Sequence, residues 1–322
     1  DVVTYKYAGK LLNLGKEKDD ANGFFNKFRR LRILKSYVKK HRFDYIIDFR
    51  MRRKPIQDWI ISKFVFKVPS VYTVRSSNAE WYLPKSSWLG KATYGSSYGV
   101  VALTETMKKY IEKRYGLGNV AVIYNSIDID YINSQLEGNK PAEGKYIIAA
   151  GRFSEDNVKQ FDKLIEAYAK SVLPGEDVKL LLLGQGTLRE YLEGLVKKLG
   201  ITDKVIFKGY QENPYTYMQG ALFFVLSSKF EGMPNVILES LACGTPVVSF
   251  DCFTGPSDII DNESNGLLIK DQDFDKLTEG INRMYLDNDL YKECSKNTVA
   301  TIRKFSMENI GQRWLDYLKI KI

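Results

Sequence analysis

Histidine, cysteine and long apolar runs are scarce in this chain of 322 residues. The longest apolar runs, such as 146–150 and 221–226, fall far short of the roughly 20 residues that a transmembrane helix needs, so we expect no membrane span. The three cysteines form an odd set without metal-ligand spacing, and we expect no signal peptide. These features predict reduced thiols used in packing, a cytoplasmic location and no metal site.

Basic residues are concentrated in the first half of the chain. Residues 1–150 hold 27 Lys and Arg against 14 Asp and Glu. The densest segment, 26–40, combines this charge with an apolar stripe at helical spacing: Phe25, Phe28, Leu31, Leu34 and Val38. Either the stripe packs on the domain's own sheet and the charges are solvated, or the basic face adsorbs to an anionic membrane surface, and both can hold together.

A second basic run, 50–54, follows an expected strand. It is either a solvated loop or a clamp for a phosphate of a lipid-linked acceptor.

Short apolar segments alternate with helical patterns along most of the chain, which indicates α/β architecture with parallel sheets. The expected strands are 45–49, 70–74 and 99–103, then 146–150, 178–183, 205–208, 221–226, 247–250 and 266–269. Helices are expected at 159–171 and 187–199, and a polar linker at 135–145. The second half should therefore be a doubly wound domain, whose ligands bind outside the carboxyl ends of the strands.

The segment 229–248, KFEGMPNVILESLACGTPVV, is the most informative part of the chain. Pro234 suits a first helical position, so we expect a helix to begin near Met233 or Pro234. Gly232 lets the backbone approach a ligand, and the first-turn amides can bind phosphate. Glu239 inside the helix can accept hydrogen bonds from a vicinal diol such as a ribose, while Glu231 can reach another part of the same ligand.

This pattern resembles the signature of retaining glycosyltransferases of family 4, over residues 146–317 and more weakly over the first half. The resemblance implies the GT-B fold, with two Rossmann-like doubly wound domains facing a cleft. It implies domains at 1–142 and 143–304, and a last helix, 305–322, that crosses back to the first domain. A strand and glycine-rich turn normally open the first domain and are not recognisable here, so its first βα units are expected to be missing.

The resemblance also assigns the site. Glu231 would contact donor-sugar hydroxyls, and Arg152 and Lys159 would stabilise the charge that develops on the leaving phosphate. The implied substrate-binding residues are Glu239, Gly232, Met233, Pro234, Asn235, Gly184, Gly186, Tyr210 and Arg75. No metal and no cofactor are expected, and UDP is favoured as the nucleotide because relatives with an ending like 251–256 commonly use it.

One departure from the family concerns the acceptor side. Many relatives carry His-Asp after the strand that corresponds to 70–74, whereas Arg75 follows it here and the only histidine, His41, lies in the basic segment. A histidine general base is therefore not expected. A retaining mechanism in which the leaving phosphate accepts the acceptor's proton fits this pattern, and Arg75 could support the sugar or the phosphate.

The sequence thus predicts a metal-independent retaining hexosyl- or N-acetylhexosaminyltransferase of cell-surface polysaccharide or glycoconjugate synthesis. Its partners would be a nucleotide-sugar donor, a glycan or lipid-linked acceptor and an anionic membrane surface, without nucleic acid. Two alternatives are a GT-B nucleotide-sugar epimerase and a basic nucleic-acid-binding protein. The second requires exposed stacking aromatics, and Phe25 and Phe28 instead belong to the apolar stripe.

Overall fold

The computed structural model describes residues 9–15, 23–136 and 144–321. The chain forms two compact units, one from Asp1–Ala102 and Lys108–Ala121 and one from Leu103–Met107 and Val122–Ile322. The segment after residue 122 groups with the second unit partly because the amide of Ile127 donates to the carbonyl of Phe305 at 2.9 Å. The expected linker at 135–145 overlaps the end of a helix, and residues 137–143 of it lie outside the described part.

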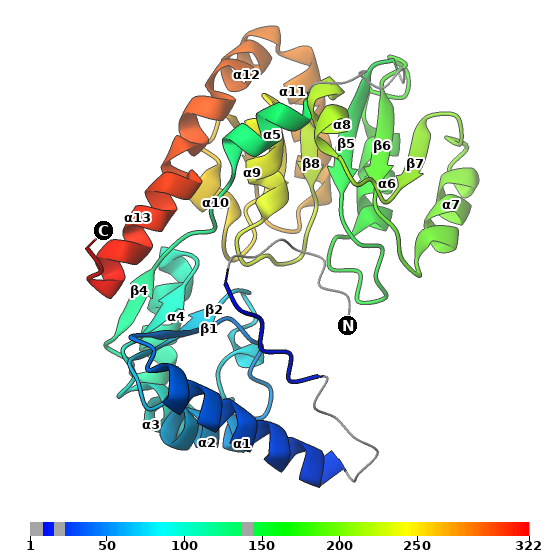
Figure 1. The fold of residues 1–322 in the computed structure, drawn as a ribbon. Coiled ribbons are helices and arrows are strands. Elements are labelled where there is room, and N and C mark those ends of the chain that lie inside the picture. Colours follow the sequence, from blue (N-terminus) through cyan, green and yellow to red (C-terminus); the bar gives the residue numbers. More distant parts are fainter. Residues whose placement is uncertain (1–8, 16–22, 137–143, 322) are drawn as a thin grey trace. The chain divides into compact units, whose positions relative to one another are not determined.

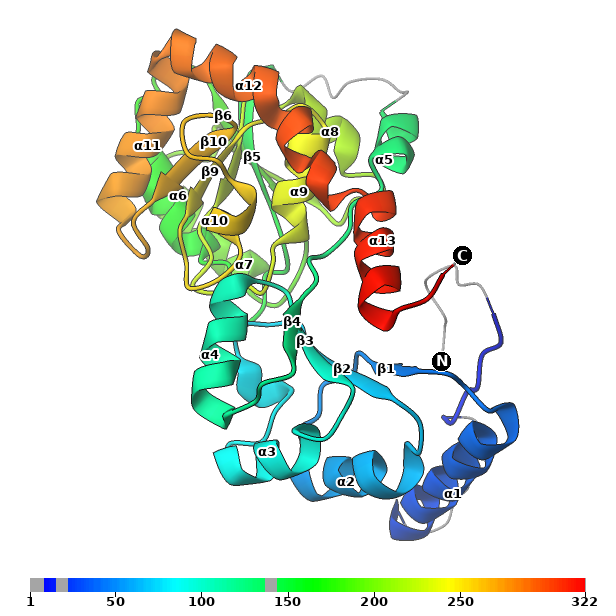
Figure 2. The same ribbon diagram turned by 90° about the vertical axis from the view of Figure 1, so that its left-hand side faces the viewer.

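The first unit contains a parallel four-stranded sheet whose strands stand in chain order (Figure 1). The strands are β1 (Ile46–Asp48), β2 (Ser70–Val74), β3 (Gly99–Ala102) and β4 (Val120–Val122). The main helices are α1 (Gly23–His41), α2 (Pro55–Ile60), its π-helical extension η1 (Ile61–Val65), α3 (Ser87–Tyr94) and α4 (Glu105–Tyr115). In two perpendicular views α1, α2 and α3 lie side by side below this sheet (Figure 2).

The apolar stripe of α1 is only partly buried. Val38 near its end is 6% exposed, but Phe25 and Phe28 are 67% and 63% exposed. Of the two alternatives for this stripe, packing on the domain's own sheet therefore does not hold for the first turns of the helix. The argument against nucleic-acid binding that rested on these two aromatics no longer holds.

Arg52, from the basic run 50–54, is a core residue. Its guanidinium is buried and donates to the carbonyls of Tyr82, Asp48, Arg50 and Thr73 at 2.8 to 3.1 Å. Arg50 is paired with the buried Asp48 at 2.7 Å. The run is therefore neither a simple solvated loop nor a clamp formed by all its cations, because Arg52 crosslinks backbone segments of its own unit.

The second unit contains a six-stranded parallel sheet in the order β10-β9-β8-β5-β6-β7. Its strands are β5 (Tyr146–Ala150), β6 (Lys179–Leu183), β7 (Val205–Gly209), β8 (Phe224–Leu226), β9 (Val247–Phe250) and β10 (Gly266–Ile269). The chain winds outward from β5 through β6 to β7, then returns to the other side of β5 and continues through β8 to β10. The topological switch point therefore lies between β5 and β8, and this unit is doubly wound as predicted.

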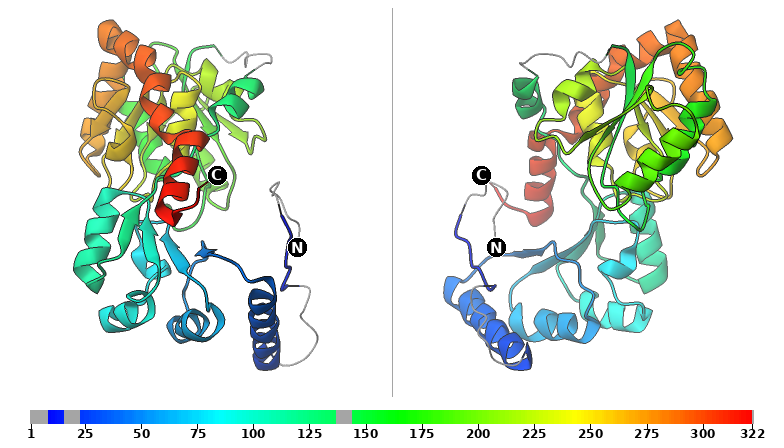
Figure 3. Two further views of the ribbon diagram at one scale, coloured as in Figure 1. Left: turned by 60° about the vertical axis from the view of Figure 1, so that its left-hand side comes forward. Right: turned by 90° about the vertical axis from the view of Figure 1, so that its right-hand side faces the viewer.

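Helices cover both faces of this sheet (Figure 3). The helices of this unit are α5 (Ile129–Gln135), α6 (Phe161–Lys170), α7 (Arg189–Lys198), α8 (Tyr215–Gly220), α9 (Asn235–Ala242), α10 (Pro256–Ile259), α11 (Phe274–Leu286), α12 (Asn288–Ile302) and α13 (Met307–Leu318). Whether α13 packs on the first domain stays a prediction.

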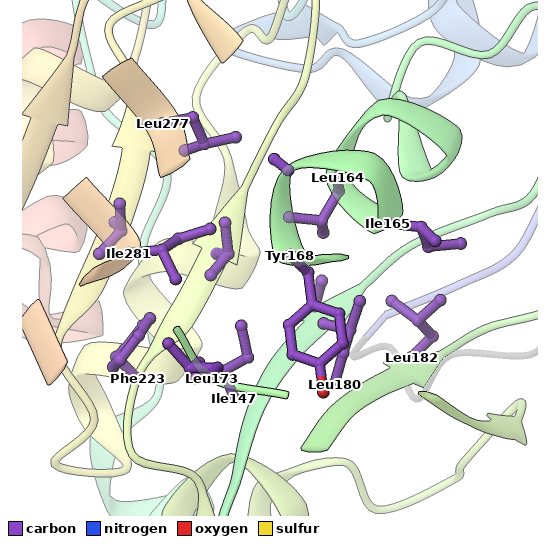
Figure 4. Packing of buried hydrophobic residues seen from close by; sticks show 14 of the residues in the cluster. Ile147, Leu164, Ile165, Tyr168, Leu173, Leu180, Leu182, Phe223, Leu277 and Ile281 are labelled. Atoms are coloured by element: carbon purple, nitrogen blue, oxygen red, sulfur yellow. The ribbon is translucent and has the colours of Figure 1, made fainter. Parts of the chain in front are cut away.

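Alternating side chains of the buried strands build two separate cores. Ile147 of β5 packs with α6 and α11, whereas its neighbour Ile148 packs with α8 and α9. Figure 4 shows the first core, in which Leu164 and Tyr168 of α6 face side chains of the strands. The Tyr168 hydroxyl donates to the carbonyl of Val178 at 2.9 Å. These cores hold the strand ends, and thus the loops that follow them, in fixed positions.

Candidate active site

The candidate site begins at the switch point of the second unit, in the loops that follow β5 and β8. Lys159 comes from the first loop and Glu231 from the second, and Nζ of Lys159 lies 2.6 Å from Oε1 of Glu231. Both side chains are partly buried, at 23% and 14% exposure. The structure therefore joins two of the three predicted catalytic residues in a charge-assisted hydrogen bond.

Backbone contacts hold these two loops together. The Ser227 hydroxyl donates to the carbonyl of Lys159 at 2.7 Å, and the amide of Lys229 donates to the carbonyl of Val158 at 2.8 Å. Gln160, next to Lys159, is buried and adopts a left-handed conformation with φ of 50°. The backbone on both sides of the Lys159–Glu231 pair is thus fixed without using either charged group.

Gly184 and Gly186 are required by close packing against the β5 loop. Gly184 has φ of 137°, and a Cβ there would lie 1.8 Å from the carbonyl oxygen of Gly151. A Cβ at Gly186 would lie 2.2 Å from the carbonyl oxygen of Phe153. Both glycines therefore stabilise the loop next to the switch point, and a nucleotide-lining role stays a prediction.

The signature helix α9 begins at Asn235, with Pro234 in the N-cap position at φ −74° and ψ 104°. The predicted start at Met233 or Pro234 is thus slightly early. Gly255 packs closely against this turn, since a Cβ there would lie only 2.7 Å from Cδ of Pro234. First-turn amides of a helix have no partner inside it, so the start of α9 offers donors for an anion.

Two residues that the sequence reasoning did not assign hold the signature loop in place. The Thr254 hydroxyl lies 2.7 Å from the carbonyl oxygen of Glu231 and 3.1 Å from that of Gly232. Nδ2 of the buried Asn125 lies 3.2 Å from the carbonyl oxygen of Met233 and 2.8 Å from Oδ1 of Asn235. Thr254 lies in the family-like stretch 251–256, which was the only sequence signal for it.

Glu239 lies on α9, largely buried and close enough to Lys159 to interact electrostatically. Burial raises the pKa of the Glu239 carboxyl, and Lys159 opposes this rise. Burial is the main cause, and the charge of Glu239 the second, that together raise the pKa of Tyr215 to about 12. A largely buried carboxylate with a raised pKa, within electrostatic reach of a cation at the switch point, is typical of a ligand-binding group.

The other predicted residues lie at strand ends. Arg152 is exposed, just after β5, and no ion pair links it to another described residue. Tyr210 is 69% exposed and follows β7 directly. Arg75 belongs to the first unit, where it follows β2 and its guanidinium lies 5.4 Å from the ring centroid of Phe49. Burial lowers the pKa of Arg75, and its role stays a prediction.

The family profile described as glycosyl transferases group 1 matches residues 132–300, more than half of the chain. The chain belongs to this family. A second profile, described as Glycosyltransferase Family 4, matches residues 8–131. The predicted family and its GT-B-like pair of parallel α/β units are therefore confirmed.

Several curated relatives are similar to this chain. One is an N-acetylgalactosamine-N,N'-diacetylbacillosaminyl-diphospho-undecaprenol 4-alpha-N-acetylgalactosaminyltransferase of Campylobacter jejuni, 33% identical over 61% of this chain and 53% of that protein. Another is the lipopolysaccharide core biosynthesis glycosyltransferase LpsE of Rhizobium meliloti, 37% identical over 56% of this chain and 52% of that protein. The chain thus spans little more than half the length of these relatives.

Solved structures share the fold at low sequence identity. Anabaena HepE in complex with UDP-glucose is 20% identical, with a TM-score of 0.74 over 90% of this chain and 82% of that one. The lipopolysaccharide galactosyltransferase WaaB in its apo form has a TM-score of 0.69 over 93% of this chain and 81% of that one, at 19% identity.

The described residues contain neither a membrane-spanning helix nor a cluster of metal ligands. None of their helices is both long enough and apolar enough to cross a bilayer. They also contain no group of three or more His, Cys, Asp or Glu that could hold a metal. The three cysteines are buried and free, in agreement with their interpretation as packing residues.

Proposed function

We propose that this protein transfers a sugar from a nucleotide-diphosphate sugar to a glycan or lipid-linked acceptor, with retention of the anomeric configuration and without a metal ion. The observation that carries the proposal is the Lys159–Glu231 pair, 2.6 Å apart at the switch point of a doubly wound sheet. Its position beside the start of α9 puts a cation, a carboxylate and helix amides within one set of loops.

Each group has a distinct task in this mechanism. Lys159 and Arg152 stabilise the charge that develops on the β-phosphate as the bond from C1 to the phosphate oxygen breaks. Glu231 accepts hydrogen bonds from donor-sugar hydroxyls, and Glu239 accepts them from the ribose. The acceptor hydroxyl forms the new bond to C1 on the same face, and its proton passes to the departing phosphate. The products are a glycoside and a nucleoside diphosphate.

Uridine is the proposed nucleotide, and N-acetylhexosamine or hexose the proposed sugar. Complexes with UDP or UDP-glucose exist for HepE, a structure similar to this chain. The printed name of the Campylobacter relative specifies N-acetylgalactosaminyl transfer to a diphospho-undecaprenol acceptor. These relatives support a lipid-linked or glycan acceptor here. Action in the cytoplasm, at an anionic membrane surface, is also part of the proposal and is supported by the basic residues of α1.

The test is a panel of UDP-, GDP- and ADP-sugars screened by thermal shift and then by isothermal titration. UDP-sugars should raise the unfolding temperature, with or without EDTA. If no nucleotide sugar of any base binds, the proposal fails. With an acceptor substrate, NMR of the product should show the anomeric configuration of the donor, and an inverted product would exclude the retaining mechanism.

A further inference from the structure

The first unit contains a cavity of about 710 Å³ between α1 and α2. This volume lies in the range of small-molecule sites. Its walls are mainly apolar, with Leu31 and Leu34 from α1 and Ile60 and Ile61 from the end of α2 and the start of η1. Such a lining excludes a free sugar or a nucleotide as the main occupant, because their polar groups would be left without hydrogen bonds.

Cations surround this apolar cavity. Lys27 and Arg30 of α1 line it, together with Arg50 and Lys54 from the segment before α2, and no acidic residue is among its described lining. Arg50 is held by its ion pair with Asp48. Lys27 and Lys54 form no ion pair with another described residue. The described lining thus offers an anion several positive side chains and no carboxylate.

The mouth of the cavity is also apolar. Phe28 and Ile56 belong to its lining and are nevertheless 63% and 74% exposed. Large exposed apolar side chains beside cations are typical of surfaces that meet the boundary of a lipid bilayer.

We infer that this cavity binds the hydrocarbon chain of a lipid that carries a phosphate, with the phosphate held by Lys27 and Lys54 at the rim. The inference rests on the proposed function in one respect, since a lipid-linked acceptor would bring such a molecule to the protein. An apolar cavity whose described lining carries cations and no acidic residue is complementary to a chain that ends in phosphate, and not to a neutral lipid or to free phosphate.

The test is a chain-length series measured by isothermal titration below the concentration at which the ligands aggregate. Octyl phosphate should bind about 15-fold more tightly than hexyl phosphate, because each buried methylene tightens binding about fourfold. Inorganic phosphate and neutral octyl glucoside should both bind more weakly than octyl phosphate. Equal affinities for hexyl and octyl phosphate, or for octyl phosphate and octyl glucoside, would overturn the inference.

Three variants locate the site. Lys54→Glu should weaken octyl phosphate binding about tenfold or more, whereas Lys109→Glu, the same charge change on exposed α4, should leave it unchanged. Leu31→Trp should fill the cavity and remove the dependence on chain length. Ile56→Glu changes an exposed position, where folding is not at risk, and should weaken the binding of octyl phosphate more than that of hexyl phosphate. Equal effects of the two lysine variants would place binding elsewhere.

A final comparison identifies the source of the lipid. Tighter binding of farnesyl phosphate than of dihexanoyl phosphatidylglycerol supports the chain of a lipid-linked acceptor, and the reverse supports a bilayer lipid. UDP titrated into the same samples separates this inference from the proposed function. Loss of UDP binding with intact alkyl phosphate binding would refute only the transferase proposal, and the opposite result would refute only the lipid cavity.

Discussion

Removal of the Glu239 carboxylate should weaken nucleotide binding and stabilise the free protein. The carboxylate is largely buried on α9, with Lys159 as its opposing charge. Hydrogen bonds to a charged group contribute about 1.5–3 kcal/mol. If Glu239 binds the ribose, Glu239→Ala should lose about that amount, which is about 10- to 150-fold in the affinity for UDP. Isothermal titration with UDP measures this directly.

The effect on stability follows from the pKa of Glu239. Burial raises it above the ordinary value of 4.5. The ionised carboxylate therefore destabilises the fold, by an amount that is absent below the ordinary pKa, grows as the pH rises towards the raised pKa, and is complete above it. Glu239→Gln should thus be more stable than the original protein at about pH 8, and this gain should shrink at about pH 4.

Urea unfolding of Glu239→Gln at both pH values is the assay for this gain. The control is Glu279→Gln on α11, where the side chain is 63% exposed and makes an ion pair with Lys276 at the surface. An unchanged UDP affinity in Glu239→Ala would refute the ribose role. A gain in stability that does not depend on pH, or that the control shares, would refute the reasoning from burial.

Three further predictions concern the scaffold around the sites. Arg52→Met should lower the free energy of unfolding by about 3–5 kcal/mol, because it leaves buried carbonyls without donors. Arg53→Met, at an exposed residue, should change this free energy by less than about 0.5 kcal/mol. Urea titrations measure both. Gly184→Ala should cost at least about 1–3 kcal/mol and weaken UDP binding, while Gly194→Ala, in open space on α7, should stabilise by about 1 kcal/mol. Burial raises the pKa of the Cys252 thiol to about 12, so iodoacetamide at about pH 8 should label it only after unfolding, as mass spectrometry can show.

Each of these three predictions has an outcome that would contradict it. Equal losses in the two arginine variants would show that the buried hydrogen bonds contribute little. A stable Gly184→Ala protein with normal UDP affinity would show that the loops move apart at no cost. Rapid labelling of Cys252 in the folded protein would contradict its burial.

The strands of the second unit could be predicted well because their apolar runs are long and bounded by turn residues. The strands 146–150, 247–250 and 266–269 occur as predicted. At 221–226 the strand itself covers only Phe224–Leu226, although the amide of Leu222 donates to the carbonyl of Tyr146 at 2.8 Å and the carbonyl of Phe223 accepts from the amide of Ile148 at 3.1 Å. The three-residue strand β4 was missed because it is too short to show a period.

The residues of the candidate site could be predicted from the sequence, but their positions relative to one another could not. The pair of Lys159 and Glu231 depends on which strands are neighbours, and the pattern of strands and helices does not specify that β8 returns beside β5. The contacts of Thr254 and Asn125 join segments far apart in the chain, so no local pattern indicates them. The partial exposure of the α1 stripe could not be predicted either, because periodicity shows which face of a helix is apolar but not what that face packs against.

Asn125 ties the segment that follows β4 to the signature loop of the second unit. The chain leaves the sheet of the first unit at Val122, and shortly afterwards the Asn125 side chain bonds to the backbone of Met233 and to Asn235 at the start of α9. These hydrogen bonds attach the segment after β4 to the loop that would surround the sugar. Asn125 follows the end of β4 closely in the sequence, so this segment has little freedom to move. A displacement of that loop by a bound donor would therefore have to break these hydrogen bonds or move the segment around Asn125 with it.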